Sequence, residues 1–470
     1  MRNLHLAAAL TALTSTLDQR PITDLALVFS PHLELPPEDP EDDTLYTQNH
    51  TFWLFLYQVL SPGTPCREIV HKATAWYQAK WGIKASSNTS GYCQARKRLD
   101  LGWLVELARQ LASKLQQKAP FVWCGRRVVV VDGSSLSMPD TMSNQSRWPQ
   151  PSGQKPGLGF PAMRIVTVFC LGTGALLHFV TGPLELAEAS LWRMLWGQLL
   201  RGDVVLGDRN FSSFAEIYLL RHRGIDLVVR RNGARTKGSR RLRRLGKDDW
   251  LVEWSRDKHC PRWLDWCYKK DIPKAMQLRE VEFSIEIPGF RTKHVIVATT
   301  LVDCAAYPPE ALAALYRRRW SIELRLRDLK TTMKMEMLRC KSPEMVEKEV
   351  AMHWVAYNLL RGLMYESKGS GQAGETARLS FKSCLDLVRQ WSPELGRAQC
   401  FAEMERLRQQ MLVSIAEQTI RAKPDRREPR ALKRRPKTYA RLTKPRHLFQ
   451  DTPHRNRYKK TQLTPQPTAT

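Results

Sequence analysis

The sequence lacks any run of apolar residues long enough to cross a membrane. A membrane-spanning helix needs about 20 consecutive apolar residues, whereas the most apolar stretch, residues 4–13, is short and is interrupted by His5. That stretch follows Arg2, as in a secretory signal peptide, but no clear small-x-small cleavage site follows it. We therefore expect neither a membrane span nor secretion.

Paired cysteines are also absent. The ten cysteines are spread singly along the 470 residues and no CxxC pair occurs, which is typical of reduced thiols in a cytosolic protein. One His/Cys cluster exists, made of His259, Cys260 and Cys267. A zinc site needs a second pair at ligand spacing, so incidental or buried thiols are the preferred interpretation.

Acidic residues are scarce relative to basic ones. The 46 Asp and Glu residues against 74 Lys and Arg give a net charge of +28. This excess predicts a polyanionic partner, with nucleic acid ahead of anionic membrane surfaces. The excess is steepest in residues 421–460, where 16 Lys or Arg accompany three acidic residues. Such a tail binds phosphates by counterion release, although a nuclear localisation signal would have a similar composition.

The first 120 residues carry a helical pattern. Apolar residues recur there at three- and four-residue intervals. A polar segment of small residues, 84–92, interrupts the pattern and is followed by Lys97 and Arg98. It is either a turn before a DNA-reading helix or a solvated loop.

From residue 126 the pattern changes to short apolar runs rich in valine and isoleucine. Such runs are typical of buried strands, and they lie at residues 128–131, 165–169, 176–180, 204–206 and 227–229. Helical patterns at 187–200 and 211–223 flank the last two runs. Three antiparallel strands followed by a strand–helix alternation predict an α/β sheet, in the order seen in ribonuclease-H-like folds.

A basic segment with four tryptophans interrupts this alternation between about residues 230 and 287. Its tryptophans are Trp250, Trp254, Trp263 and Trp266. Strand patterning returns at 294–301. Helices are then predicted from 310 to about 334, over 345–364, and as a last segment over 376–419.

Two aspartates follow predicted strands directly. Asp132 comes after residues 128–131, and Asp208 comes after Gly207 at the end of another run. A carboxylate just beyond a buried strand is held rigidly at the sheet edge where ligands of α/β proteins usually bind. Either aspartate taken alone could instead be a turn former or a helix cap.

The predicted helix 310–334 carries four functional candidates on one face. At about 100° per residue, Tyr316, Arg319, Glu323 and Lys330 fall within about 60° of one another and extend roughly 21 Å. That face could follow a nucleic-acid backbone with one acid in its middle. A salt-bridged surface helix is the alternative, since Arg319 and Arg327 flank Glu323 at four residues.

Three carboxylates on two strands and a helix suit two-metal phosphoryl transfer. Carboxylate oxygens are the ligands that Mg²⁺ prefers, and two such ions activate the attacking oxygen and stabilise the leaving one. The surrounding cations would neutralise phosphates that the metals do not contact.

At these residues the sequence resembles a known family. The spacing of Tyr316, Arg319, Glu323 and Lys330, with Trp320 and Ile322 between them, is similar to the YREK signature of DDE transposases of bacterial insertion sequences (insertion-sequence family four, the cut-and-paste class). Asp132 and Asp208 match the first two members of the DDE triad. Segments 154–160, 288–292 and 339–345 also resemble such proteins, so the likeness covers roughly residues 50–450.

The resemblance implies a fold and a domain organisation. It implies an α/β, ribonuclease-H-like catalytic core interrupted by a mostly β insertion, with helical N-terminal and C-terminal regions. The expected divisions are a helical DNA-binding domain over 1–120, the core over 121–232 and 294–366, the insertion over 233–293, a helical region over 367–420 and the basic tail over 421–470.

The resemblance also implies residue roles and a reaction. Asp132, Asp208 and Glu323 would be the catalytic residues and would bind Mg²⁺ or Mn²⁺. Contacts to DNA are expected from Tyr316, Arg319, Lys330, Arg209 and Trp320. The reaction would be strand cleavage at the terminal inverted repeats, hairpin formation and opening, and joining to target DNA, carried out by a synaptic homodimer in the bacterial cytoplasm, at the nucleoid.

Three points stay open in the sequence. An inactive DNA-binding relic of a transposase, or a metal-dependent structure-specific nuclease of the same fold, would keep many of these features. Family members stack a flipped base on a tryptophan of the insertion, but residues 292–302 contain none. The stacking residue is therefore unassigned, because each tryptophan further upstream could belong to the core of the insertion.

Overall fold

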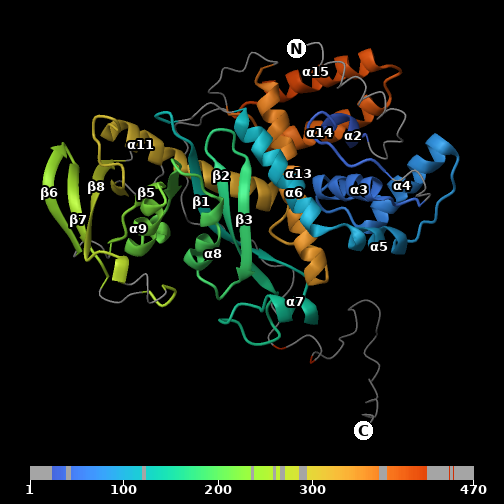
Figure 1. Ribbon diagram of the computed structural model, residues 1–470. Helices are drawn as coiled ribbons and strands as arrows, with labels where there is room; N and C mark the ends of the chain where they lie inside the picture. The colour runs from blue at the N-terminus through green and yellow to red at the C-terminus, as the bar shows by residue number, and fades with distance from the viewer. Residues whose placement is uncertain are drawn as a thin grey trace, which may run out of the picture.

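The fold was analysed in a computed structural model, shown in Figure 1. The structure describes residues 24–38, 44–118, 123–233, 238–257, 261–264, 270–284, 294–369 and 378–420, together with residues 444 and 448. The apolar stretch near the N-terminus, the His259, Cys260 and Cys267 cluster and nearly all of the basic tail lie outside these residues.

A nine-stranded mixed sheet lies at the centre of the molecule. Its strand order is β3-β2-β1-β4-β5-β9-β8-β7-β6. The strands are β1 (Val128–Ser137), β2 (Ala162–Cys170), β3 (Leu176–Pro183), β4 (Val204–Gly207), β5 (Asp226–Arg230), β6 (Ser239–Gly246), β7 (Asp249–Ser255), β8 (Ala275–Ser284) and β9 (His294–Thr299).

The first five strands have the predicted ribonuclease-H-like arrangement. Strands β1, β2 and β3 pair antiparallel, whereas β4 pairs parallel with both β1 and β5. Residues 128–131 and 204–207 are buried throughout, as expected for strands that are covered on both faces. This topology confirms the α/β fold predicted from the sequence.

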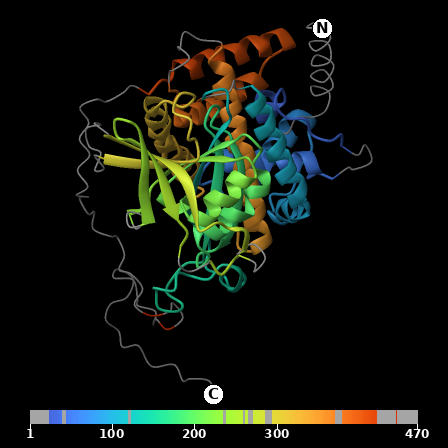
Figure 2. The same cartoon turned by 60° about the vertical axis from the view of Figure 1, so that its left-hand side comes forward.

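Strands β8, β7 and β6 of the predicted insertion extend the same sheet beyond β9. Strand β9 pairs antiparallel with β5, and β8, β7 and β6 follow it outwards in turn. Figure 2 shows these strands at the end of the sheet that lies away from the N-terminal helices. The insertion is therefore β-rich, as expected, while its limits as a separate domain stay a prediction.

Helices cover both faces of the sheet. One face packs against α8 (Glu188–Met194) and α9 (Phe214–His222). The other face packs against the long helix α13 (Pro343–Ser367). Trp354 of α13 donates its indole N–H to the carbonyl oxygen of Leu176 at 2.6 Å, and Asn358 bonds both backbone groups of Leu176, so α13 is fixed on β3.

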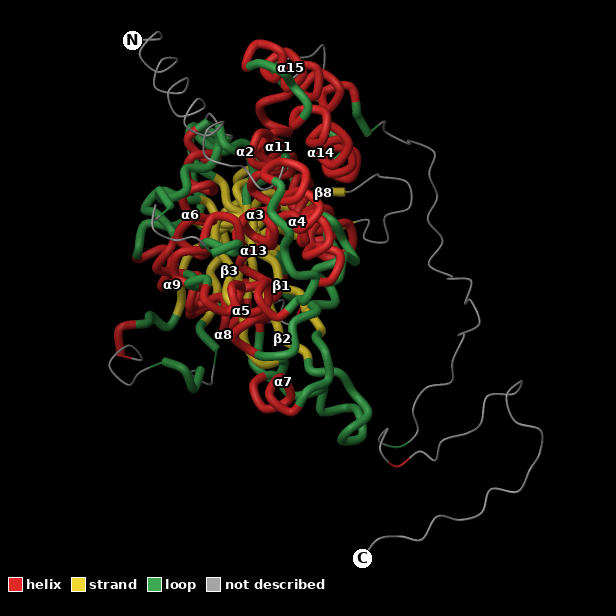
Figure 3. Tube along the Cα trace, turned by 90° about the vertical axis from the view of Figure 1, so that its right-hand side faces the viewer, coloured by secondary structure: helices red, strands yellow, loops and turns green. Residues whose placement is uncertain are grey.

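The N-terminal and C-terminal helices pack around α13 (Figure 3). The N-terminal group comprises α2 (Leu25–Phe29), α3 (Gln48–Leu60), α4 (Cys66–Trp81), α5 (Ser90–Arg98) and α6 (Leu101–Gln117). The C-terminal group is α14 (Phe381–Gly396) and α15 (Phe401–Glu417). The last helical segment, predicted over 376–419, consists of two helices, because α14 ends at Gly396 and the chain is extended at Cys400 before α15 begins.

Candidate active site

Asp132 lies inside strand β1 and not at its end. It pairs with Thr167 of β2, and β1 continues to Ser137, so the predicted strand end at residue 131 is wrong. The reason is that β1 has two neighbours of different length. Its ladder with β4 stops at Val130, whereas its ladder with β2 continues. On the β4 side, Asp132 therefore stands just beyond the paired region.

Asp208 directly follows β4, as predicted. Its carboxylate accepts the backbone N–H of Asn210 at 2.7 Å and caps the 3₁₀ turn Arg209–Phe211. Gly207 lets the end of β4 approach β1 closely. A Cβ at Gly207 would lie 3.2 Å from Cβ of Phe211 and 3.3 Å from Cγ1 of Val131, so a larger residue would move Asp208.

Asp132 and Ser134 share one face of β1 because side chains alternate along a strand. Val130 and Leu136, on the same face, belong to the core beneath α13. The two polar residues between them thus occupy a gap in an otherwise apolar row. Lys330 reaches this gap, and its Nζ donates to Oγ of Ser134 at 2.9 Å.

The electrostatics of Asp132 show which groups surround it. Burial raises the pKa of its carboxyl to about 6, the Gly133 N–H and the Arg319 guanidinium oppose this rise, and the charges of Asp208 and Glu188 add to it. The structure therefore brings Asp132, Asp208 and Arg319 together. Two neighbouring carboxylates that repel each other in a buried place are stabilised by a cation.

The helix that carries Glu323 is not uniform. It consists of α11 (Pro309–Arg317), a 3₁₀ turn (Arg318–Trp320), α12 (Ser321–Arg327) and a π-helical turn (Asp328–Thr332). The prediction of one regular helix from 310 to 334 is wrong in this respect. The tighter and wider turns change the rotation per residue, so the angular positions calculated for a regular helix do not hold beyond Arg317.

Arg325 fixes α12 on the sheet. Its side chain is buried and donates to the carbonyl oxygens of Cys170 at 2.7 Å and Leu171 at 3.0 Å. Burial lowers its pKa to about 10. Glu323 lies two residues before this anchor, so Arg325 determines where the helix holds that carboxylate.

Glu323 is held by Arg319. The two side chains form an ion pair at 3.4 Å, with 55% of the Glu323 side chain exposed. The Nε of Arg319 is buried and has no hydrogen-bond partner within the described part of the chain. Glu323 is thus connected to Asp132 through Arg319. Within the described ranges, no group of three or more His, Cys, Asp or Glu side chains is arranged to hold a metal ion.

The other predicted DNA contacts differ in exposure. Tyr316 is 1% exposed, and its ring packs against Phe283 and Trp320; burial raises its pKa. Trp320 is half-buried at the edge of the core, whereas Arg209 is exposed. Contacts of these residues with DNA stay predictions.

Glu188 is a residue of this site that the sequence did not reveal. It begins α8, on the face of the sheet opposite α13, and its carboxylate lies over Gly133, where a Cβ would meet it at 2.6 Å. It accepts from Asn210 at 3.4 Å and pairs with Arg164 at 3.3 Å. An acidic residue in the first turn of a helix is common, so its sequence position gives no distinguishing signal.

The donor set fits a hard divalent cation. Asp132 and Asp208 would supply carboxylate oxygens; burial, and after it the charge of Asp208, raises the pKa of Asp132. Oxygen ligands of this type select Mg²⁺ or Mn²⁺ over softer metals. Glu323 is paired with Arg319 and does not form a group of three possible metal ligands with the two aspartates in the described ranges.

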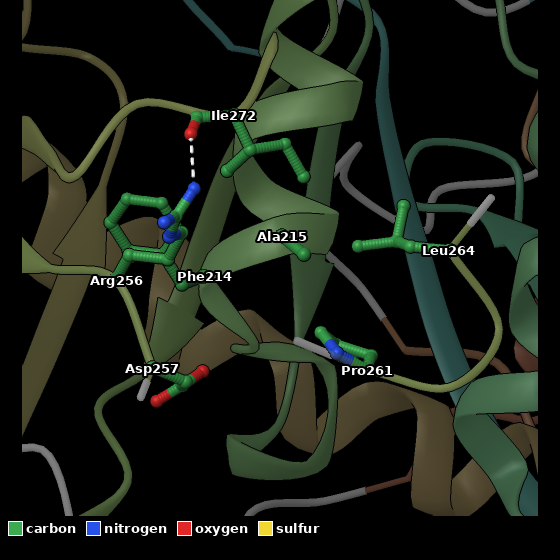
Figure 4. Close-up of a pocket in the computed structure, with 7 residues that line it drawn as sticks. All are labelled: Phe214, Ala215, Arg256, Asp257, Pro261, Leu264 and Ile272. Atoms are coloured by element: carbon green, nitrogen blue, oxygen red, sulfur yellow. Dashed lines mark hydrogen bonds between the residues drawn. The ribbon is translucent and has the colours of Figure 1, made fainter. Parts of the chain in front are cut away.

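Two other predicted features lie away from these carboxylates. The polar segment 84–92 precedes and enters α5, with Lys97 and Arg98 exposed at the end of that helix; a role in reading DNA stays a prediction. Figure 4 shows a small cavity between α9 and the segment after β7, across which Arg256 donates to the carbonyl of Ile272 at 2.6 Å. None of the predicted site residues lines it.

The tryptophans of the insertion have different surroundings. Trp254 is fully buried and donates to Glu280 at 2.7 Å. Trp263 is 37% exposed and packs edge-on against Trp196. Trp266 lies outside the described residues. No helix in the described ranges is both long and apolar enough to span a membrane.

Comparison with known proteins places these features in a family. The family described as "Transposase DDE domain" matches residues 123–359, just over half of the chain. The chain is 26% identical over 402 residues to transposase InsG for insertion sequence element IS4 of Escherichia coli (strain K12), covering 82% of this chain and 85% of that protein. Among solved structures, the piggyBac transposase synaptic complex with hairpin DNA covers 83% of this chain and 84% of its own, with a TM-score of 0.40 and 9% identity. Since the family match includes both aspartates and the Glu323 helix, the chain belongs to the transposases with a DDE domain, enzymes that cut DNA.

Proposed function

We propose that this transposase binds the terminal inverted repeats of an insertion sequence, cleaves the DNA at both ends and joins the ends to target DNA. The observation that carries the proposal is the position of Asp132, just beyond the β1–β4 ladder, near Asp208 at the end of β4 and near Arg319 of the segment that bears Glu323. Rigid carboxylates beside buried cations suit phosphoryl transfer.

Asp132, Asp208 and Glu323 are the residues that would hold Mg²⁺ or Mn²⁺. When bound, these ions activate the attacking oxygen and stabilise the leaving oxygen of the phosphodiester. The protein's own contribution is rigidity. Asp132 is fixed in the β1–β2 ladder, and Asp208 is fixed by its bond to Asn210.

Arg319 links DNA binding to the position of Glu323. The guanidinium holds Glu323 at 3.4 Å and retains a buried Nε without a partner in the described residues. A DNA phosphate gives Arg319 a second charge-assisted acceptor, which competes with the Glu323 carboxylate for the guanidinium. Arg319 then releases Glu323 toward the two aspartates, so DNA completes the carboxylate set.

Other side chains would position the DNA. Lys330 lies beside Ser134, two residues from Asp132, and so contacts phosphates close to the cleaved bond. Tyr316, Arg209 and Trp320 contact the same DNA end. The helical N-terminal region recognises the inverted repeat, and the basic tail binds backbone phosphates.

The assembly and the order of steps follow from the resemblance noted in the sequence. Two copies of the chain act as a homodimer on paired ends, and the second strand is cut through a hairpin. The protein works in the bacterial cytoplasm at the nucleoid, where its substrate lies.

The test is cleavage of a linear duplex that carries the DNA flanking the gene on each side. Wild type is compared with D132N, D208N and E323Q in Mg²⁺ and in EDTA. We expect metal-dependent nicking at the repeats, lost in all three variants while DNA binding remains. E323Q that cleaves at the wild-type rate would remove Glu323 from the triad.

The same assay distinguishes the two alternatives. Specific binding by wild type without cleavage would identify a DNA-binding relic. Cleavage that depends on DNA structure and not on the repeat sequence, with no joining to target DNA, would identify a nuclease of this fold.

A further inference from the structure

The outermost strand of the sheet, β6, carries a row of exposed arginines. Its sequence is SRRLRRLG, and the side chains of residues 240–244 are all exposed. We call Arg240, Arg241, Arg243 and Arg244 the arginine ridge. In Figure 1 this strand lies at the left edge of the molecule, on the side opposite the N-terminal helices.

Two bulges distribute the arginines over both faces of β6. The register with β7 shifts between Arg241 and Arg243, and again between Arg244 and Gly246. In a regular strand, residues three apart point to opposite faces. The bulge at Leu242 instead places Arg241 opposite Val252 and Arg244 opposite Trp250, which share one face of β7.

Trp250 orders the arginines on that face. The Arg241 guanidinium lies 4.5 Å and the Arg244 guanidinium 5.8 Å from the centre of the Trp250 ring, both within cation–π range. On the other face, Arg240 pairs with Glu253 at 2.8 Å. The ridge therefore presents positive charge on both sides of the sheet edge, with two guanidiniums held in place before any ligand binds.

Protection of a sheet edge is the simplest alternative explanation. Charged residues on an edge strand prevent edge-to-edge pairing with other chains. Mobile lysines would serve that purpose equally well. Arginines ordered on a tryptophan have already lost part of their conformational freedom, which favours binding of a phosphate.

The position of the ridge sets its distance from the carboxylates. Six strand spacings separate β1 from β6, roughly 29 Å at about 4.8 Å each. Base pairs of B-DNA rise about 3.4 Å. A duplex that runs past the strand ends from the active site toward β6 would therefore reach the ridge about nine base pairs from the cleaved bond.

We propose that the arginine ridge of β6 binds the sugar–phosphate backbone of duplex DNA, without sequence preference, about nine base pairs from the active site. The proposal rests on the proposed function only for the orientation of the DNA. Charge complementarity favours this occupant, because among the described residues one acid, Glu253, forms an ion pair with one of the four arginines, while Asp248, Glu280 and Glu282 line a cavity beside Arg241.

The test measures DNA affinity as a function of salt for R241Q/R244Q. Probes are fluorescein-labelled duplexes that end in the flanking DNA of the gene, shortened stepwise, and an unrelated duplex of equal length. The control is R397Q/R406Q, which removes two exposed arginines from α14–α15 and so changes the net charge equally. R240Q/R243Q supplies the same test if loss of the Trp250 contacts lowers stability.

We expect affinity on long duplexes to fall about tenfold, and the slope of log K against log salt to weaken by roughly two. The loss of affinity should be equal for the flanking and the unrelated duplex and absent in the control variant. It should also be absent for duplexes that end less than about nine base pairs from the cleaved bond. If the ridge variant and the control have the same slope of log K against log salt, the proposal is overturned. If the ridge variant keeps the wild-type slope but self-associates, the arginines protect the sheet edge instead. If the wild-type protein does not cleave DNA while the ridge variants still lose DNA affinity, the proposed function is wrong, but the proposal that the ridge binds DNA holds.

Discussion

At the scale of single residues, Glu188 connects the segments that carry the two aspartates. It lies over Gly133, next to Asp132, and accepts from Asn210, whose backbone N–H binds Asp208. Its charge also acts on Asp132. Glu188 is therefore a positioning residue that supports both carboxylates from the opposite face of the sheet.

We predict that E188A slows metal-dependent cleavage by about 10- to 100-fold, the usual effect of losing a residue that orients metal ligands. Binding of the transposon end should stay within about twofold of wild type, because Glu188 lies behind the strands. Cleavage rates at increasing Mn²⁺, together with Mn²⁺-induced thermal stabilisation without DNA, measure the effect. E185A is the control, since Glu185 is exposed nearby. Identical metal dependence in both variants would assign Glu188 a purely structural role.

The sequence identified the site residues by spacing but not their surroundings. Asp132 and Asp208 were found because each follows an apolar run, and that pattern reflects the strands directly. Glu188 and Arg164 meet across two elements, and no local pattern records such a contact. The sequence predicts the Arg319–Glu323 ion pair as a surface alternative. The burial of the Arg319 Nε, which has no partner within the described residues, depends on packing that only the fold supplies.

At the scale of elements, the position of the Glu323 helix depends more on the hydrogen bonds of Arg325 to the sheet than on a regular α-helical backbone. Its 3₁₀ and π turns interrupt the α-helical hydrogen bonds on both sides of α12. Apolar periodicity predicted the helix but could not show these turns, because each alters only one or two positions. Arg325 compensates by binding two carbonyl oxygens at the end of β2 and just beyond it.

We predict that R325M lowers the free energy of unfolding by about 2–4 kcal/mol, because two buried carbonyls lose a charged donor. Cleavage should fall more strongly than DNA binding, since α12 also positions Glu323. Urea unfolding and the cleavage assay measure both effects. R327M, at an exposed position on the same helix, should change the unfolding free energy by less than about 0.5 kcal/mol. Equal stability of the two variants would contradict the anchoring role.

At the scale of the whole molecule, the sheet joins parts that are far apart in the sequence. Strand β5 pairs with β9 across the entire insertion, in antiparallel register from Val228 and Thr299 to Arg230 and Val297. The apolar runs predict both strands, yet no local sequence pattern specifies that these two strands, which are far apart in the sequence, pair with each other. The break near residue 230 stays a prediction as a domain boundary, while the continuity of the sheet through it became visible only in the structure.

The N-terminal helices also meet the sheet through a titratable contact. His178 of β3 is half-buried and faces Arg109 of α6 and Arg127, just before β1. Burial, together with the charges of the two arginines, lowers its pKa to about 4. The folded protein thus favours neutral His178, so its contribution to stability is complete above about pH 6.5 and is lost as the pH falls toward 4.

We predict that wild type loses up to about 2 kcal/mol more unfolding free energy than H178Q between pH 7.5 and pH 5. Asp132 and Asp328 act in the opposite sense, because burial raises the pKa of each to about 6, but they are present in both proteins and cancel in the difference. Urea unfolding of the full chain at the two pH values measures it. Since protonated His178 repels the guanidinium of Arg109, the loss should be somewhat smaller in R109Q. Equal losses in wild type and H178Q would show that His178 does not cause this pH dependence.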